Sequence, residues 1–130
     1  MAEADSVETL ELGDLVAYSD ERRVRSKICQ TDQIVSELVC YEGGQGTKQH
    51  VHPHQDEIFT CIDGEGVITF ADPNVADRPI TKGSIVLVPA GIRHGVSTEP
   101  GNRLVLMFTK GPGVPNPHRL RKAEGAQADG

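Results

Sequence analysis

Short runs rich in Val, Ile and Thr, separated by Gly and Pro, constrain the fold of this chain more than any other feature. Its 130 residues include 14 Gly and 8 Pro, spread along most of the sequence. Alternating runs of β-branched residues are typical of β-strands, and Gly and Pro mark the turns between them. No long segment repeats apolar residues with a helical period. The pattern therefore predicts a sandwich or barrel built from many short strands.

The predicted strands fill the middle of the chain. They cover residues 23–31, 33–41, 48–52, 57–62, 67–70, 80–82, 84–88, 94–97 and 103–109. We expect Asp63-Gly64-Glu65-Gly66 to form a tight hairpin turn, because Asp-Gly pairs favour such turns. A chain of this length suits one domain. We assign residues 1–21 to a lead-in segment with a short strand or helical turn, residues 22–112 to the barrel, and residues 113–130 to a flexible tail.

The charge balance and the lack of long apolar runs limit the expected partners. A formal net charge of −6 opposes binding to phosphate backbones, so we expect no nucleic-acid partner. No apolar run approaches the roughly 20 residues that cross a bilayer, and the acidic N-terminus does not resemble a secretory signal. We therefore predict a cytoplasmic protein with no membrane partner. Its cysteines, Cys29, Cys40 and Cys61, are expected to be reduced and buried.

Histidines cluster in one short segment, and this clustering points to metal binding. His50 and His52 stand two apart on a predicted strand, so their side chains point to the same face. Their Cα atoms are then about 6.6 Å apart, a spacing at which two imidazoles can bind one ion. Pro53 ends the strand, and Glu57 opens the next one, where its carboxylate can supply a third ligand. His94 can reach the same point from a neighbouring strand.

The spacing around these residues resembles the first of the two motifs of the cupin family. Gly44 is followed after five residues by His50-x-His52. Glu57 follows after four further residues, and Gly64 after six more. These positions reproduce the spacing of the motif.

A second segment resembles the other cupin motif. Gly83 is followed after five residues by Pro89-x-Gly91, and then after two residues by His94. The motif usually closes with Asn, and Thr98 occupies that position here. Because this position is not a metal ligand in the family, the substitution affects a local hydrogen bond and leaves the ligand set intact. With the flanking strands, the resemblance extends over residues 22–110.

The resemblance to cupins implies both a fold and a metal site. The fold is the cupin double-stranded β-helix, an all-β barrel related to the jelly roll. The implied ligands of one divalent transition metal (Mn, Fe, Ni or Zn) are His50, His52, Glu57 and His94. Such a set leaves open positions on a six-coordinate ion for water, O₂ or a small-molecule substrate. Glu57 is also the candidate catalytic base, as proposed for some family members.

Other side chains near the predicted site have competing interpretations. Phe59 and Cys61 share strand parity with Glu57, so they line either a substrate pocket or the apolar core. Lys48 shares a face with the histidine pair, where it either steers an anionic substrate or extends to water. His54 competes with the ligand histidines, but it follows the strand-ending proline, so we expect it to be exposed or to support the ligands. His118, in the tail, is expected to be solvated.

Several functions fit this interpretation, because one fold hosts many chemistries. The favoured one is a metal-dependent enzyme acting on a small oxygenated metabolite, with dioxygenase-like chemistry. A non-redox isomerase or lyase of sugars or sugar acids is the second. A module that binds a small ligand without catalysis is the third, and a barrel that keeps the polar cluster but binds no metal is the plainest alternative. Because small cupins usually pair, we also expect a homodimer that exchanges a strand from residues 23–41.

Overall fold

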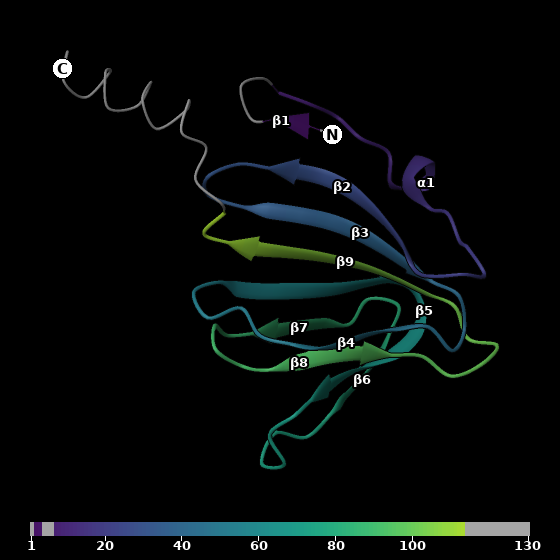
Figure 1. Ribbon diagram of the computed structural model, residues 1–130. Coiled ribbons are helices and arrows are strands. Elements are labelled where there is room, and N and C mark those ends of the chain that lie inside the picture. The colour runs from purple at the N-terminus through teal and green to yellow at the C-terminus, as the bar shows by residue number, and fades with distance from the viewer. Residues whose placement is uncertain (1, 4–6, 114–130) are drawn as a thin grey trace.

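The computed structural model describes residues 2–3 and 7–113, and these consist mainly of strands (Figure 1). The elements are β1 (Ala2–Glu3), α1 (Leu12–Leu15), β2 (Val24–Gln30), β3 (Val35–Tyr41), β4 (Gly46–His50), β5 (Asp56–Phe70), β6 (Arg78–Thr81), β7 (Ile85–Val88), β8 (His94–Ser97) and β9 (Leu104–Gly111). The predicted all-β fold is confirmed. Of the tail predicted over residues 113–130, residues 114–130, with His118, lie outside the described residues. No described helix is long and apolar enough to cross a membrane.

The described strands curl into a barrel of two sheets that share the long strand β5. The first sheet has the order β1-β2-β3-β9-β5-β7, and the second has the order β4-β8-β5-β6. In Figure 1, β2, β3 and β9 lie above β4 and β8, and β5 passes from one layer to the other. This architecture is the double-stranded β-helix that the sequence motifs implied.

The hairpin predicted at residues 63–66 is wrong, because β5 runs through these residues without reversing. Residues 56–64 of β5 pair with β9, whereas residues 65–68 pair with β6 and residues 67–70 with β8. A register shift between Cys61 and Asp63 marks a β-bulge, and Gly64 has a φ of 79°. Since a bulge bends and twists its strand, the Asp-Gly pair turns β5 from the first sheet into the second.

The main core fills the barrel between the sheets and leaves room for the site at one end. Because side chains alternate along a strand, each core strand gives one face to this interior. Removing this apolar surface from water, at about 25 cal/mol per Å², is the main force that closes the barrel. The buried members are Val39, Tyr41, Phe59, Cys61, Ile68, Ile80, Val88, Val96, Leu104, Leu106 and Phe108.

The N-terminal segment covers part of the outer face of the first sheet. Its α1 residues pack against a second cluster formed by Leu38, Cys40 and Val105. The Arg103 guanidinium lies 4.1 Å from the centroid of the Tyr18 ring, a cation–π contact that holds the end of the segment. The predicted helical turn of the lead-in segment is α1, and it belongs to the packed structure.

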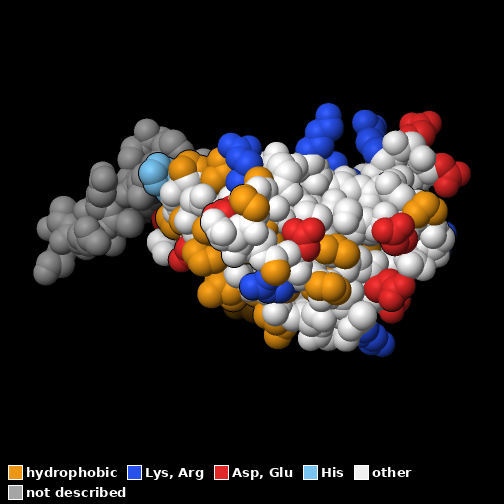
Figure 2. Space-filling view, turned by 90° about the horizontal axis from the view of Figure 1, so that it is seen from below, with side chains coloured by type: hydrophobic (Ala, Val, Ile, Leu, Met, Phe, Trp, Pro, Cys, Tyr) orange, Lys and Arg blue, Asp and Glu red, His pale blue; other side chains and the backbone are white. Residues whose placement is uncertain are grey.

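The outer face of β5 and β7 carries exposed apolar side chains. Ile85 is 69% exposed, Leu87 62% and Ile58 47%. Ile58 and Leu87 are cross-strand partners, so these side chains lie side by side. Hydrophobic side chains also gather on part of the surface in the space-filling view of Figure 2. The N-terminal segment therefore covers only part of the apolar outer surface of the first sheet.

Replacement of Gly64 by Ala tests the role of the bend in β5. A Cβ at Gly64 would lie 1.9 Å from the Arg103 carbonyl oxygen, in a backbone conformation that favours glycine. We expect Gly64→Ala to lower the free energy of unfolding by about 2–5 kcal/mol, from left-handed strain and overpacking together. Urea denaturation measures this loss.

The matched control is Gly83→Ala, because Gly83 has a φ of 92° but nothing within 4 Å of an added Cβ. This variant introduces only the backbone strain, so its free energy of unfolding should fall by only about 1–2 kcal/mol. Equal losses in the two variants would show that the close approach of β5 to the Arg103 carbonyl does not matter.

Candidate metal centre

Three strands and one loop bring the predicted ligands together at one end of the barrel. His50 ends β4, His52 lies in the following loop, Glu57 is near the start of β5, and His94 begins β8. One ligand atom from each of these residues lies within 4.8 Å of the others. His50 and His94 are direct partners in the β4–β8 register, which places their rings 4.4 Å apart between centroids. The cluster is compact enough to surround one ion.

Backbone carbonyls fix the orientation of two of the rings. The Nδ1 atom of His50 lies 2.9 Å from the Lys48 carbonyl oxygen, and that of His94 lies 2.8 Å from the Ile92 carbonyl oxygen. Because a carbonyl oxygen only accepts hydrogen bonds, each Nδ1 atom donates a proton. In the neutral ring, Nε2 then carries the lone pair that binds a metal. Metal-binding histidines are commonly oriented in this way.

Glu57 lies at the centre of the cluster and is 3% exposed. Its Oε1 atom lies 2.9 Å from Nε2 of His94 and 3.7 Å from Nε2 of His52. A buried carboxylate oxygen and an imidazole lone pair repel each other at such a distance unless a proton or a cation lies between them. The geometry therefore requires a proton or a cation where the metal is expected.

The titration of His94 reflects the same requirement. Burial lowers the pKa of His94, but the hydrogen bond to Glu57, the contact with the Ile92 carbonyl and the charge of Glu57 outweigh burial and raise the pKa above its ordinary value. Burial, followed by the charge of Lys110, lowers the pKa of His52 and favours its neutral, metal-binding form. A metal ion at this point would compete with a proton for His94.

The donor set fits a divalent transition metal. Neutral imidazoles suit Fe, Ni, Cu and Zn, whereas sites for Mg and Ca consist mainly of oxygen. His50, His52, Glu57 and His94 would hold the ion, and the other side of the cluster opens into a cavity of about 480 Å³. An ion held here would have ligands on one side and open space on the other.

The predicted pocket residues Phe59 and Cys61 have different surroundings in the structure. Phe59 lines the cavity and packs edge-on against the ring of His94, with 5.6 Å between centroids. Cys61 belongs to the buried core, where its thiol faces the carbonyls of Asp63 and Gly64. Only Phe59 of this pair is a wall residue, because the bulge that follows Cys61 carries β5 away from the cavity.

Lys48 lines the cavity, although the parity argument that placed it there does not hold. Thr47 pairs with Val96 and His50 with His94, so β4 has one extra residue between these pairs. This bulge lets Thr47 and His50 both line the cavity while the Lys48 side chain stays exposed. The expected strand over residues 48–52 also ends early, at His50.

The sequence profile of the cupin domain matches residues 37–109, which is more than half of the chain. The chain belongs to the cupin family. The matched stretch contains the whole ligand cluster, so this cupin has its candidate metal centre inside the domain that defines the family. The family resemblance of the two sequence motifs is confirmed.

Solved structures with similar folds support the same architecture. A protein from Thermus thermophilus is 25% identical to this cupin, with a TM-score of 0.74 over 82% of this chain and 98% of that one. A double-stranded β-helix protein from Klebsiella pneumoniae is 22% identical, with a TM-score of 0.75 over 85% and 95%. A candidate mannose-6-phosphate isomerase from Ralstonia eutropha is 21% identical, with a TM-score of 0.67 over 80% and 97%. The comparison with curated protein sequences found no significant match.

Thr98, at the position where the cupin motif usually has Asn, still ties the two motifs together. Its hydroxyl accepts a hydrogen bond from the Gly44 amide at 2.9 Å and donates one to the Gln45 carbonyl at 2.6 Å. The side chain thus connects the end of β8 to the turn before β4. A hydroxyl maintains the alignment of the strands that carry His50 and His94.

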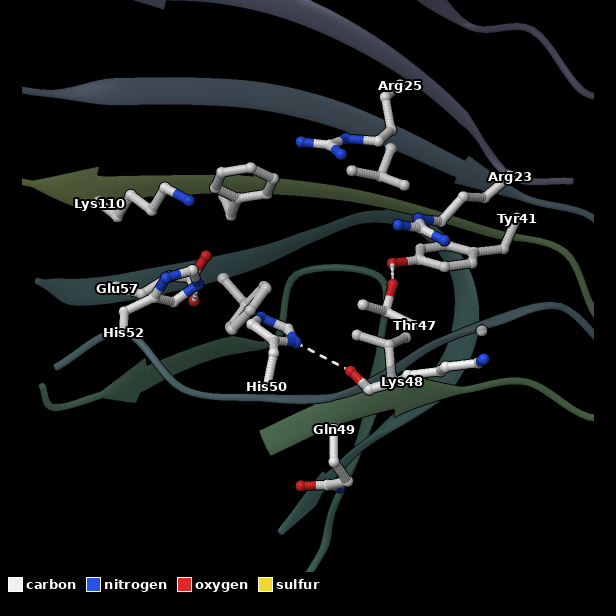
Figure 3. A pocket seen from close by; sticks show the side chains of 15 residues that line it. Arg23, Arg25, Tyr41, Thr47, Lys48, Gln49, His50, His52, Glu57 and Lys110 are labelled. Carbon is white, nitrogen blue, oxygen red and sulfur yellow. Dashed lines mark hydrogen bonds and ion pairs between the residues drawn. The ribbon is translucent and has the colours of Figure 1, made fainter. Parts of the chain in front are cut away.

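Several cavity residues of this cupin were missed by sequence reasoning. Tyr41 and Thr47 face the cavity and share a hydrogen bond of 2.7 Å between their hydroxyls. Arg23, Arg25 and Lys110 also line it (Figure 3). Lys110 is the direct cross-strand partner of Glu57, a relation that depends on the β5–β9 register. The sequence carries no signal for that register, although strand parity does group Arg23 with Arg25.

Removal of one ligand tests the metal centre of this cupin. Loss of a supporting hydrogen bond around a metal ligand typically weakens binding about 10–100-fold, so loss of a ligand should cost at least about 100-fold. We expect His94→Ala to lower the affinity for Zn²⁺ or Ni²⁺ by this amount in calorimetric titrations.

His54→Ala is the matched control, because His54 is exposed and lies outside the cluster. Its metal affinity should equal that of the wild type. A wild-type affinity in His94→Ala, or a large loss in His54→Ala, would contradict the assigned ligand set.

Proposed function

We propose that this cupin is a metal-dependent enzyme that acts on a small oxygenated metabolite, with dioxygenase-like chemistry favoured. The observation that carries the proposal is the position of the ligand cluster, which borders an open cavity of about 480 Å³. Cavities of about 300–1,000 Å³ are typical of small-molecule sites. When bound, a divalent metal ion polarises substrate oxygens as a Lewis acid and, if it is iron, activates O₂.

The walls of the cavity suit a small molecule with both polar and apolar parts. Phe59, Phe108 and Val96 supply apolar surface, and Tyr41 and Thr47 add hydroxyls. A substrate held among these side chains meets the imidazoles at one end and hydrogen-bonding groups at the other.

Glu57 is the candidate base of the site. It is the one carboxylate that lines the cavity among the described residues. Its Oε1 atom is hydrogen-bonded to Nε2 of His94. The carboxylate is therefore placed to accept a proton from a substrate bound beside it. The same side chain would also hold the metal ion, so as a base Glu57 would have to leave the ion before it accepted a proton.

A non-redox isomerase or lyase of sugars or sugar acids is the second candidate function. It is supported by the polar and cationic lining of the cavity, which suits a hydroxylated, anionic molecule. The fold neighbour from Ralstonia eutropha, itself a candidate mannose-6-phosphate isomerase, is consistent with this class. A module that binds such a molecule without turnover is the outcome if neither activity is found.

Elemental analysis of protein purified without chelators or an affinity tag tests the proposal. We expect about one divalent metal ion per chain, because one cluster of the described residues has ligand geometry. If the metal is iron, catechols, diketones and flavonols should be tested for oxygen uptake with an oxygen electrode.

Turnover that is unchanged under nitrogen, in a protein holding zinc or nickel, would replace the oxygenase assignment by the isomerase or lyase class. A chain that contains no metal after reconstitution with each candidate ion would refute metal-dependent catalysis altogether. The apo protein and the His94→Ala variant serve as controls.

A homodimer remains a proposal, as does the cytoplasmic location. The exposed side chains of Ile85 and Leu87 on β7 support self-association, because apolar surface on a strand favours pairing with another molecule. The strand exchange expected for residues 23–41 stays a prediction, and within one chain β2 and β3 pair with each other. The mass measured by light scattering distinguishes one chain from two.

A further inference from the structure

The cavity beside the candidate metal centre is positively charged, although the protein as a whole is acidic. The chain has a formal net charge of −6, with 19 acidic and 13 basic residues besides histidine. Arg23, Arg25, Lys48 and Lys110 contribute to the lining of the cavity, whereas Glu57 is the one acidic lining residue among the described residues. The lining of the cavity therefore has a charge opposite in sign to that of the chain as a whole.

Ion pairs within the chain account for only part of this charge. The Arg25 guanidinium binds the Glu37 carboxylate through two hydrogen bonds of 2.8 and 3.2 Å. Among the described residues, no carboxylate lies within ion-pair distance of Arg23 or Lys110. Both of these side chains are half-buried, where an unpaired charge is less well solvated than at the surface. They are therefore available to bind an anion.

The cations have defined positions relative to the ligands. Lys110 lies across the strand pair from Glu57, and its Nζ atom is 5.2 Å from the centroid of the Phe108 ring. Figure 3 shows Arg23 and Lys110 on the wall opposite His50. A molecule bound at the histidines would extend toward this wall.

We propose that the substrate carries an anionic group, a carboxylate or a phosphate, distinct from the oxygens that face the metal ligands, and that Lys110 and Arg23 bind this group. The inference rests on the proposed function and narrows it to small hydroxy or oxo acids with a second anionic end. An ion held by Glu57 and the histidines would bind the chelating oxygens of such a molecule, and the cationic wall binds its other anionic group. Charged hydrogen bonds of this kind are among the stronger contacts in proteins.

Three acids with one common chelating end test the proposal. Glycerate, malate and 3-phosphoglycerate share a 2-hydroxy carboxylate, but their far ends are a hydroxyl, a carboxylate and a phosphate. We expect zinc-loaded protein to bind malate or 3-phosphoglycerate at least about tenfold more tightly than glycerate in calorimetric titrations. The tighter of the two identifies the anionic group.

Substitution of the cationic wall residues tests whether they cause the tighter binding of the acids with two anionic groups. Lys110→Gln and Arg23→Gln, each compared as zinc-loaded protein, should reduce the preference over glycerate to about threefold or less. Lys82→Gln is the matched control, because Lys82 is exposed and does not line the cavity. It removes the same charge from the protein and should keep the wild-type preference.

Each remaining outcome has a definite meaning. If the wild type binds all three acids equally, or binds none of them while holding zinc, the inference fails and the metal centre stands. Loss of the preference in Lys82→Gln would also overturn it, since net charge alone would then explain the selectivity. Failure of the wild type to hold zinc or any other candidate ion would refute the proposed function itself.

Discussion

Glu57 and His94 meet at 2.9 Å inside the barrel, and most of the site depends on this contact. Glu57 lies on the part of β5 that pairs with β9 and β7, and His94 begins β8 in the other sheet. Their buried contact therefore joins the two sheets at the end where the barrel opens. Because a buried carboxylate beside an imidazole needs a positive centre, the contact also explains why the fold suits a cation there.

Two bulges provide the geometry that this contact requires. The bulge in β5 bends the strand from one sheet into the other, so a single strand contributes to both walls of the barrel. The bulge in β4 shifts the strand by one residue, so that Thr47 and His50 both line the cavity. Such irregularities are common beside active sites because they redirect single side chains without breaking the sheet.

The lining of the site differs in charge from the chain as a whole. Acidic residues outnumber basic ones in the chain, yet the cavity wall gathers arginine and lysine from β2, β4 and β9 and from the residue before β2. A metal ion would add to this positive potential. A low-dielectric cleft of one sign attracts ligands of the opposite sign. The same barrel can therefore remain acidic on its surface and still favour an anion beside its histidines.

The sequence by itself determined the strand-rich fold and the identities of the clustered ligands. Val, Ile and Thr runs with Gly and Pro between them prescribe strands through local backbone preferences, and the two motifs carry the ligands at fixed spacing. These properties depend on neighbours in the chain, and local patterns record them directly. The Asp63-Gly64 pair shows the limit of such reasoning, because the same residues serve a hairpin or a bend, and only the pairing of β5 with β9 and β6 decides between them.

Only the tertiary structure decided which side chains surround the site. Cys61 and Phe59 have the same parity on one strand, yet the bulge leaves Phe59 in the cavity wall and Cys61 in the core. Lys110 stands opposite Glu57 through the β5–β9 register, across many residues of intervening chain. Register between distant strands is set by how the whole sheet packs, and a one-residue shift would turn each side chain to the other face. For this reason the ligands could be named from the sequence, and the cationic wall that faces them could not.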